Sequence, residues 1–322
     1  MASVTLPESA KLAQDELVAG VIENIITVNR MFEVLPFDGI EGNALAYNRE
    51  NVIGGIVSAS VGDDLTTDLG TGAQGAGGGA GYAKAAATFT QVTSTLTTIL
   101  GDAEVNGLIQ ATRSGDGNDQ TATQIASKAK HAGRKFQDML INGTGTGSQF
   151  DGLLNLCAAS QTVNTGANGS ALSFSILDEL LDLVVDKDGQ VDYFAMPART
   201  IRAFMALLRA LGGASISDVV ELPSGQRVPA YRDVPMFRND YIPINQTKGG
   251  STDTTTIFAG TLDDGSRQHG IAGLTADRQS GVNVVDVGES ETRDERIWRV
   301  KWYAGLALFS EKGLACADGI LD

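Results

Sequence analysis

The longest regular pattern in the chain is an amphipathic stretch that begins near residue 119 and ends in a run of glycines. Its apolar residues recur every three or four positions, as on one face of an α-helix: Ile125, Ala129, Ala132, Phe136, Met139 and Leu140. Gly143, Gly145 and Gly147 follow, and glycine favours a helix end because it reaches left-handed dihedral angles at low cost. A helix of about 24 residues is roughly 36 Å long. With its narrow, alanine-rich stripe, it is suited to lie across a sheet, and a short apolar strand is expected after it.

The N-terminal segment predicts a second amphipathic helix. Thr5 and Glu8 have the form of a capping box, and the helix is expected to run to about residue 29. Its apolar face includes Leu17, Val21 and Ile25. An ordinary surface helix is the simplest interpretation. No obvious partner for this face follows directly in the chain, which favours an arm that packs on another subunit.

Residues 43–100 predict a long extended hairpin. Short β-like runs open the segment, and residues 87–100 are rich in threonine, typical of a strand exposed to water on both faces. Seven glycines fall between residues 70 and 81, among them Gly75 and Gly78, and such a run predicts a flexible tip. Because an isolated two-stranded hairpin is marginally stable, we expect it to rest on a neighbour.

The remaining segments alternate between helical and extended patterns. A short helix is expected at about residues 103–112, and a helix capped by Ser175, a strand at 191–196 and a helix opened by Pro197 predict an α/β unit over 157–245. Strands are expected at 255–260, 270–277, 282–287 and 296–309. These strands are predicted to form the sheet that the long helix crosses, which makes 157–245 an insertion.

Composition excludes several classes of function. The chain has 24 basic and 39 acidic residues, a net charge of −15, which disfavours tight binding to duplex DNA or to an anionic membrane. Two cysteines are too few for a disulfide framework, so a reducing compartment is expected. The start of the chain has neither the basic nor the apolar region of a signal peptide, and no apolar run approaches the length of a membrane span.

No catalytic, cofactor or metal motif stands out. The chain has two histidines, His131 and His269, and lacks CxxC, HExxH and GxSxG patterns. The glycines at 143–147 follow a helix and lack the GK[ST] ending, whereas a phosphate loop opens a helix. The acidic runs at 116–119 and 263–265 lack the spacing and closing Glu of a calcium loop and are interpreted as turns. The basic cluster at 128–135 is interpreted as a solvated helix face, with a weak phosphate-facing role as the alternative.

The order of these segments resembles that of the major capsid proteins of tailed bacteriophages, which have the Hong Kong 97-like fold. The most specific match is LINGTGTGSQFDGLLN at residues 140–155, similar to the family's turn after its spine helix. Supporting matches are the runs at 195–197, 234–236, 239–243 and 258–260. The resemblance covers nearly the whole chain, and the order of the motifs carries it.

The resemblance implies an α+β fold with an N-terminal arm (1–42), an extended hairpin loop (43–100), a peripheral domain with the spine helix (101–156 and 246–322) and an inserted α/β axial domain (157–245). It implies a non-enzymatic subunit, without cofactor or metal, that forms pentamers and hexamers in the shell of a virion assembled in the host bacterial cytoplasm. A separate scaffolding protein, a portal, a decoration protein and weak non-specific contact with packaged double-stranded DNA are the implied partners.

The residues expected to matter for assembly lie in the arm and the hairpin. They are Leu17, Val21, Ile25, Gly75, Gly78 and Lys84. Lys84 is included because some relatives cross-link lysine to asparagine, and it is the only lysine in the hairpin. The alternatives are an encapsulin-like compartment, a tail-tube or decoration protein, and an enzyme built on residues 157–245.

Overall fold

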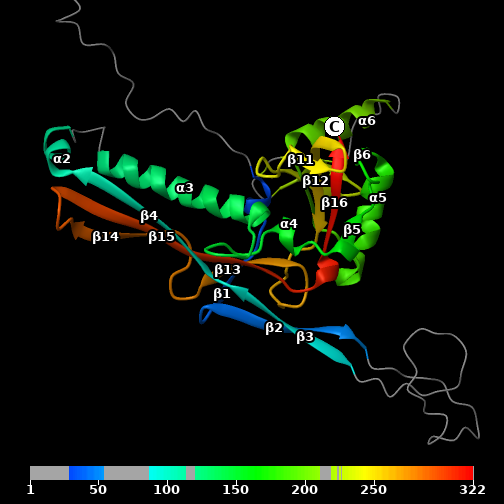
Figure 1. The fold of residues 1–322 in the computed structure, drawn as a ribbon, viewed down its shortest axis with the longest axis horizontal. Coiled ribbons are helices and arrows are strands. Elements are labelled where there is room, and N and C mark those ends of the chain that lie inside the picture. The colour runs from blue at the N-terminus through cyan, green and yellow to red at the C-terminus, as the bar shows by residue number, and fades with distance from the viewer. Residues whose placement is uncertain are drawn as a thin grey trace, which may run out of the picture. The chain divides into compact units, whose positions relative to one another are not determined.

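Figure 1 shows the computed structural model, which describes residues 29–53, 87–113, 120–210, 219–222, 225 and 227–321. All six residues expected to act in assembly, Leu17, Val21, Ile25, Gly75, Gly78 and Lys84, lie outside the described residues, as does the helix expected in the N-terminal arm. The described part falls into two compact units, one made of residues 100–133 and 282–301 and the other of the remainder.

Most of the described helices lie in the middle of the chain, between two runs of consecutive strands. The helices and 3-10 helices, in chain order, are η1 (Met31–Glu33), α2 (Gly107–Arg113), α3 (Gln120–Asn142), α4 (Leu153–Leu156), η2 (Ala159–Gln161), α5 (Phe174–Leu183), η3 (Asp186–Gly189), α6 (Ala198–Ala210) and η4 (Glu311–Gly313). The strands are β1 (Phe37–Ile40), β2 (Ala44–Val52), β3 (Thr88–Thr95), β4 (Thr97–Asn106), β5 (Thr162–Val163), β6 (Ser170–Ala171), β7 (Tyr193–Met196), β8 (Val219–Glu221), β9 (Arg227–Tyr231), β10 (Val234–Arg238), β11 (Gln246–Lys248), β12 (Ser251–Gly260), β13 (Ile271–Ala276), β14 (Asn283–Glu289), β15 (Glu295–Leu308) and β16 (Leu314–Leu321).

The larger sheet is built around strands from the middle and the end of the chain. Its order is β5-β16-β12-β7-β10-β9-β8, with β11 on β12 and β6 on β16. One hydrophobic core joins α5, α6 and this sheet, and includes Leu177, Leu180, Phe204, Phe194 and Ile257. The helices contribute to this core because α5 and α6 each place apolar residues at helical spacing on one face.

Two predictions for this part of the chain are wrong. Helix α5 begins after Ser173, whose side chain accepts a hydrogen bond from the Ile176 amide at 3.4 Å, rather than after Ser175. Strand β12, expected beside the long helix, instead pairs with β7 and β16. Residues 254–260 are buried throughout, as suits a central strand covered on both faces. Residues 246–322, expected in the peripheral domain, therefore contribute strands to both sheets.

The second sheet has the order β1-β13-β15-β14, and β4 also pairs with β15. The predicted long helix is confirmed as α3, of 23 residues, and Phe136 is fully buried. The Phe136 ring lies 4.7 Å from the ring of Trp302 on β15, 5.5 Å from Phe150 and 5.6 Å from Phe37, measured between centroids. This aromatic cluster packs the C-terminal half of the helix onto the sheet.

The end of α3 differs in detail from the sequence expectation. Gly143 does not adopt a left-handed conformation; a Cβ there would collide with the carbonyl oxygens of Phe150 and Met139. Residues 143–152 form a closed loop at the end of the helix. The Gly143 amide donates to the Met139 carbonyl and the Gly152 amide donates to the Gly143 carbonyl, both at 2.9 Å. The apolar run that follows is the short helix α4 rather than a strand, because the Gly152 carbonyl accepts the amides of Asn155 and Leu156.

The two ends of the 43–100 segment form the predicted antiparallel pair, with Ala44 opposite Thr95 and Val52 opposite Thr88. No residue of β2 or β3 is fully buried. The inner face of β2 rests partly on a small core through Leu45 and Tyr47. On β3, Val92 and Ser94 are partly buried while their neighbours are exposed, so this strand is not equally exposed on both faces. The outer face leaves Phe89 66% exposed.

The short helix expected at 103–112 begins later than predicted. Residues 97–106 form strand β4, in which Thr97, Ile99, Ala103 and Val105 are buried. Helix α2 starts at Gly107. Residues 103–106 therefore form a strand, because β-sheet packing of the alternate buried side chains overrides the weak helical preference of a short segment.

We expect Phe136→Ala to lower the free energy of unfolding by about 3–5 kcal/mol, because it empties the centre of the aromatic cluster. Denaturant unfolding of the unassembled subunit measures the effect. Gln124→Ala on the exposed side of the same helix is the matched control and should change stability by less than about 0.5 kcal/mol. Equal losses for the two variants would contradict this account of the core.

Candidate functional site

Asp186, in η3, is a buried carboxylate with three hydrogen-bond donors around it. The chain passes between the two larger sheets from β4 to β5, from β12 to β13, and from β15 through η4 to β16, and the last two of these connections meet at Asp186. Asp186 lies beside both connections, and its side chain is only 8% exposed. We call the residues around it the Asp186 junction: Asp186, Lys187, Asp192, Thr261, His269, Gly270, Phe309, Ser310, Lys312 and Gly313.

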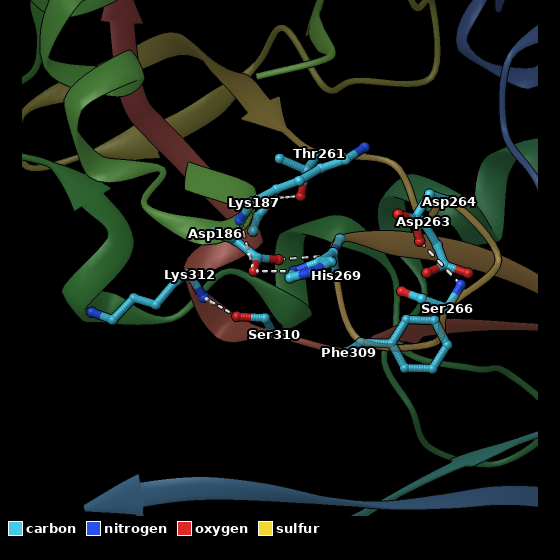
Figure 2. Close-up of polar contacts among 12 residues, drawn as sticks. Asp186, Lys187, Thr261, Asp263, Asp264, Ser266, His269, Phe309, Ser310 and Lys312 are labelled. Atoms are coloured by element: carbon cyan, nitrogen blue, oxygen red, sulfur yellow. Dashed lines mark hydrogen bonds and ion pairs between the residues drawn. The ribbon is translucent and has the colours of Figure 1, made fainter. Parts of the chain in front are cut away.

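Both carboxylate oxygens of Asp186 are occupied. Oδ1 accepts from the Lys187 amide at 3.1 Å and from Nδ1 of His269 at 2.8 Å, while Oδ2 accepts from the Gly270 amide at 2.9 Å. Figure 2 shows the carboxylate directed at the imidazole of His269. A buried carboxylate is stable only when its charge is met by donors in this way. The carboxylate therefore fixes η3 to the β12–β13 connection.

Gly270 is required at this position for two reasons. Its φ is +57°, and an added Cβ would collide with the Thr261 carbonyl. Its backbone joins three segments, because its amide donates to Asp186 and its carbonyl accepts from the Phe309 amide at 2.9 Å. Thr261 extends the connection, since its amide donates to Gly313 at 2.9 Å. The β12–β13 and β15–β16 connections are thus hydrogen-bonded to each other.

The turn that carries Asp186 has an unusual backbone. Lys187 and Asp188 adopt φ of 52° and 59°, a left-handed conformation that costs roughly 1–2 kcal/mol per non-glycine residue. The Lys187 side chain compensates by reaching Asp192 and the Leu262 carbonyl, each at 3.4 Å, and the Leu262 amide donates to Asp192 at 2.8 Å. The surrounding contacts hold the strained turn in place.

The carboxylate of Asp186 also changes the acidity of His269. The hydrogen bond to Asp186 raises the pKa of His269 above its usual 6.5, partly opposed by burial, with the charge of Asp264 adding to the rise. The His269 side chain is 34% exposed, so solvent screens this effect. The protonated imidazole is nonetheless the form that the junction favours.

The base of the β2–β3 hairpin is attached to the same corner of the chain. The Arg49 guanidinium donates to the carbonyls of Leu308 and Phe309, the latter at 2.9 Å, and pairs with Glu311 at 2.8 Å. The Tyr47 hydroxyl donates to the Leu308 carbonyl at 2.6 Å, and its ring packs edge-on against Phe309, 5.3 Å between centroids. Arg49 is 16% exposed at its side chain, so this attachment is mostly shielded from water.

An open groove of about 510 Å³ lies between the hairpin base and the junction. Its lining includes Tyr47, Arg49, Arg267, Glu311 and Lys312. Arg267 is held by a bidentate pair with Asp38, and Arg49 is held by Glu311. The charged groups of the groove are therefore largely paired with one another.

The hydrogen bonds of the Asp186 junction fix the positions of η3 and of the β12–β13 and β15–β16 connections. Within the described ranges, no three His, Cys, Asp or Glu side chains gather in the manner of a metal site. No helix in the described part of the chain is long and apolar enough to cross a membrane. The acidic run at 263–265 is a turn, as predicted: Asp263 accepts the Gly265 amide and Asp264 accepts the Ser266 amide.

The sequence does not single out the junction. His269 is one of two histidines without a metal or catalytic motif, and Asp186 and Arg49 carry no motif either. The one local signal is the run of three charged residues ahead of Gly189, a pattern typical of a turn. Their partners lie more than 80 positions away for Asp186 and about 260 for Arg49, so spacing along the sequence cannot reveal them.

Solved structures with the same fold include several shell proteins. The encapsulin SrpI from Synechococcus elongatus PCC 7942 is 20% identical, with a TM-score of 0.71 over 99% of this chain and 96% of that chain. The capsid of cyanophage A-1(L) is 13% identical, with a TM-score of 0.69 over 99% and 100%, and that of a native GTA particle is 12% identical, with a TM-score of 0.64 over 100% of both. The fold is the Hong Kong 97-like capsid fold.

The family follows from a separate comparison. The model of the SU10 major capsid protein matches residues 51–222, more than half of the 322 residues, and the chain belongs to this family. It is therefore a shell-forming phage capsid subunit and a component of the virion. The comparison with curated proteins gives no match.

We expect Asp186→Asn to destabilise the subunit by about 2 kcal/mol, because an amide nitrogen would face one of the three N–H donors that the carboxylate now accepts. Thermal or denaturant unfolding measures the change. Asp188→Asn removes the same charge from the exposed side of the same turn, and asparagine tolerates the left-handed conformation, so this control should be near neutral.

The raised pKa of His269 predicts a pH-dependent contribution to stability. A group whose pKa is higher in the folded state stabilises that state fully below its unfolded value, here 6.5, and the contribution is lost as pH rises through the folded pKa. The stability difference between the wild type and His269→Gln should be largest below pH 6.5 and should shrink above it. A difference that grows with pH would contradict the pairing with Asp186.

Proposed function

We propose that this subunit assembles as pentamers and hexamers into the icosahedral head shell that encloses the double-stranded DNA of a tailed phage. The observation that carries the proposal is the β2–β3 pair, which is attached to the body at its base and has no fully buried residue. A two-stranded ribbon is marginally stable in water. A neighbouring subunit in a shell would supply the missing cover.

The attachment suits an extension that bears force in a shell. Arg49 and Tyr47 bind the main chain at the end of β15, so the hairpin is held through backbone carbonyls rather than by side-chain packing alone. The outward face, with Phe89 66% and Ile53 71% exposed, offers apolar area for a partner. Heterologous contacts of this kind close rings of subunits.

The proposed division of labour follows the segment order. Residues 1–42 form an arm, 43–100 the extended loop, 101–156 with 246–322 a peripheral domain, and 157–245 an axial domain whose copies meet at capsomer centres. Leu17, Val21 and Ile25 would bind a neighbouring subunit, and Gly75 and Gly78 would let the loop adapt to unequal positions. Lys84 is the candidate for a covalent link.

The acidic net charge of −15 supports weak, non-specific contact with the packaged genome, because a container must hold DNA without binding it tightly. We propose that a separate scaffolding protein directs assembly in the bacterial cytoplasm, that a portal occupies one vertex, that a decoration protein can bind outside, and that the subunit has no enzymatic activity.

An encapsulin-like compartment is the second candidate, favoured by the TM-score of 0.71 to the SrpI encapsulin. The contents of the particles distinguish a phage head from an encapsulin-like compartment. Electron microscopy of particles from the native source, with measurement of encapsidated nucleic acid, should find DNA-filled heads with one distinct vertex. Small shells that contain protein and no DNA would establish the compartment instead. Tubes, or a monomer at high concentration, would contradict both.

Arg49→Ala should reduce the yield of closed shells at least roughly tenfold while leaving the subunit folded, because the hairpin base loses its bonds to the Leu308 and Phe309 carbonyls. Negative-stain microscopy and sedimentation measure assembly, and circular dichroism measures folding. Arg227→Ala, which removes an arginine 77% exposed at its side chain, is the control. Normal shells from Arg49→Ala would contradict a role for this attachment.

A further inference from the structure

The only two cysteines of the chain lie together in the folded subunit although 158 residues separate them. Cys157 follows α4 and is partly exposed, whereas Cys316 lies within β16 and is 7% exposed. The 3-10 helix η2 and strand β5 bring them together, because β5 runs parallel to β16 with Thr162 opposite Cys316. Tertiary pairing alone creates this proximity.

The hydroxyl of Thr162 lies close to both thiols. Its Oγ1 is 3.3 Å from Sγ of Cys316 and 3.9 Å from Sγ of Cys157, and it donates to the Ala158 carbonyl at 3.1 Å. The thiols also interact with each other. Their shared hydrogen bond raises the pKa of Cys157, together with burial, and lowers the pKa of Cys316. Cys157 is the more accessible sulfur and meets a dissolved reagent first, whereas the lowered pKa of Cys316 suits this thiol to the closing attack.

We propose that Cys157 and Cys316 form a reversible intramolecular disulfide that links the segment after α4 to the C-terminal strand. A small-molecule disulfide of the glutathione class is the oxidant. Cys157 first attacks it, which breaks the reagent's S–S bond, forms a mixed disulfide and releases one thiol that carries the Cys157 proton. Cys316 then attacks the Cys157 sulfur, and the second thiol leaves with the Cys316 proton.

In this exchange, one protein dithiol and one reagent disulfide react to give one protein disulfide and two reagent thiols. The bond would close a loop containing nearly half of the chain, which includes α5, α6, β7–β15 and the Asp186 junction. Cross-links that close long loops restrict the unfolded chain most in the entropic description. The disulfide would therefore stabilise the subunit without adding a contact to the folded state.

The test uses the purified full chain incubated with oxidised glutathione under native conditions. We expect both thiols to disappear together, the mass of the monomer to fall by two hydrogens, and peptide mapping to join the Cys157 peptide to the Cys316 peptide. The melting midpoint should rise by roughly 5–10 °C and return on reduction. Cys157→Ser, at the partly exposed position, is the folded control and should show no rise.

Three results would overturn the proposal. One is glutathione retained on Cys157 while Cys316 stays free, and another is a disulfide between two subunits through Cys157. The third is two thiols that remain free in native protein while a small-molecule thiol control oxidises. Cys316→Ala separates the steps, because it should stop at the mixed disulfide on Cys157.

Discussion

A buried carboxylate holds this subunit together at the point where its two sheets exchange strands. Asp186 accepts one N–H donor from the adjacent Lys187 and two from His269 and Gly270, which lie more than 80 positions further along the chain. The adjacent connections are hydrogen-bonded to each other through Thr261, Gly270 and Gly313. The arrangement depends on Gly270, since any side chain there would collide with Thr261. The connections fixed in this way join β12 to β13 and β15 to β16, which are strands of the two larger sheets.

The β2–β3 hairpin is attached next to the Asp186 junction. Tyr47 and Arg49 bind the main chain where β15 ends, so the hairpin, which has little cover of its own, is attached beside a densely hydrogen-bonded part of the molecule. This combination is meaningful for a shell subunit. In the proposed shell, neighbouring subunits would cover these extensions, and the stability of each subunit would then depend on assembly.

The local signals in the sequence were good guides to single elements. The stripe ending at Phe136 predicted α3, because an apolar repeat sustained over about six turns fits a helix and not a strand. The threonine-rich strand and its partner were predicted as an antiparallel pair. Short segments were less predictable: residues 103–106 belong to a strand, and 153–156 form a helix, since a few residues carry too little local preference to oppose their packing.

The sequence by itself determined the amphipathic faces, the places where glycine ends an element, the acidic charge and the order of segments that identifies the fold. Only the tertiary structure decided that β12 joins the larger sheet, that Asp186 meets His269 and that Cys157 meets Cys316. The physical reason is that periodicity records which side of an element is apolar. Strand partners and buried polar contacts depend instead on geometry between segments separated by about 80 to 260 residues, and no local pattern encodes that geometry.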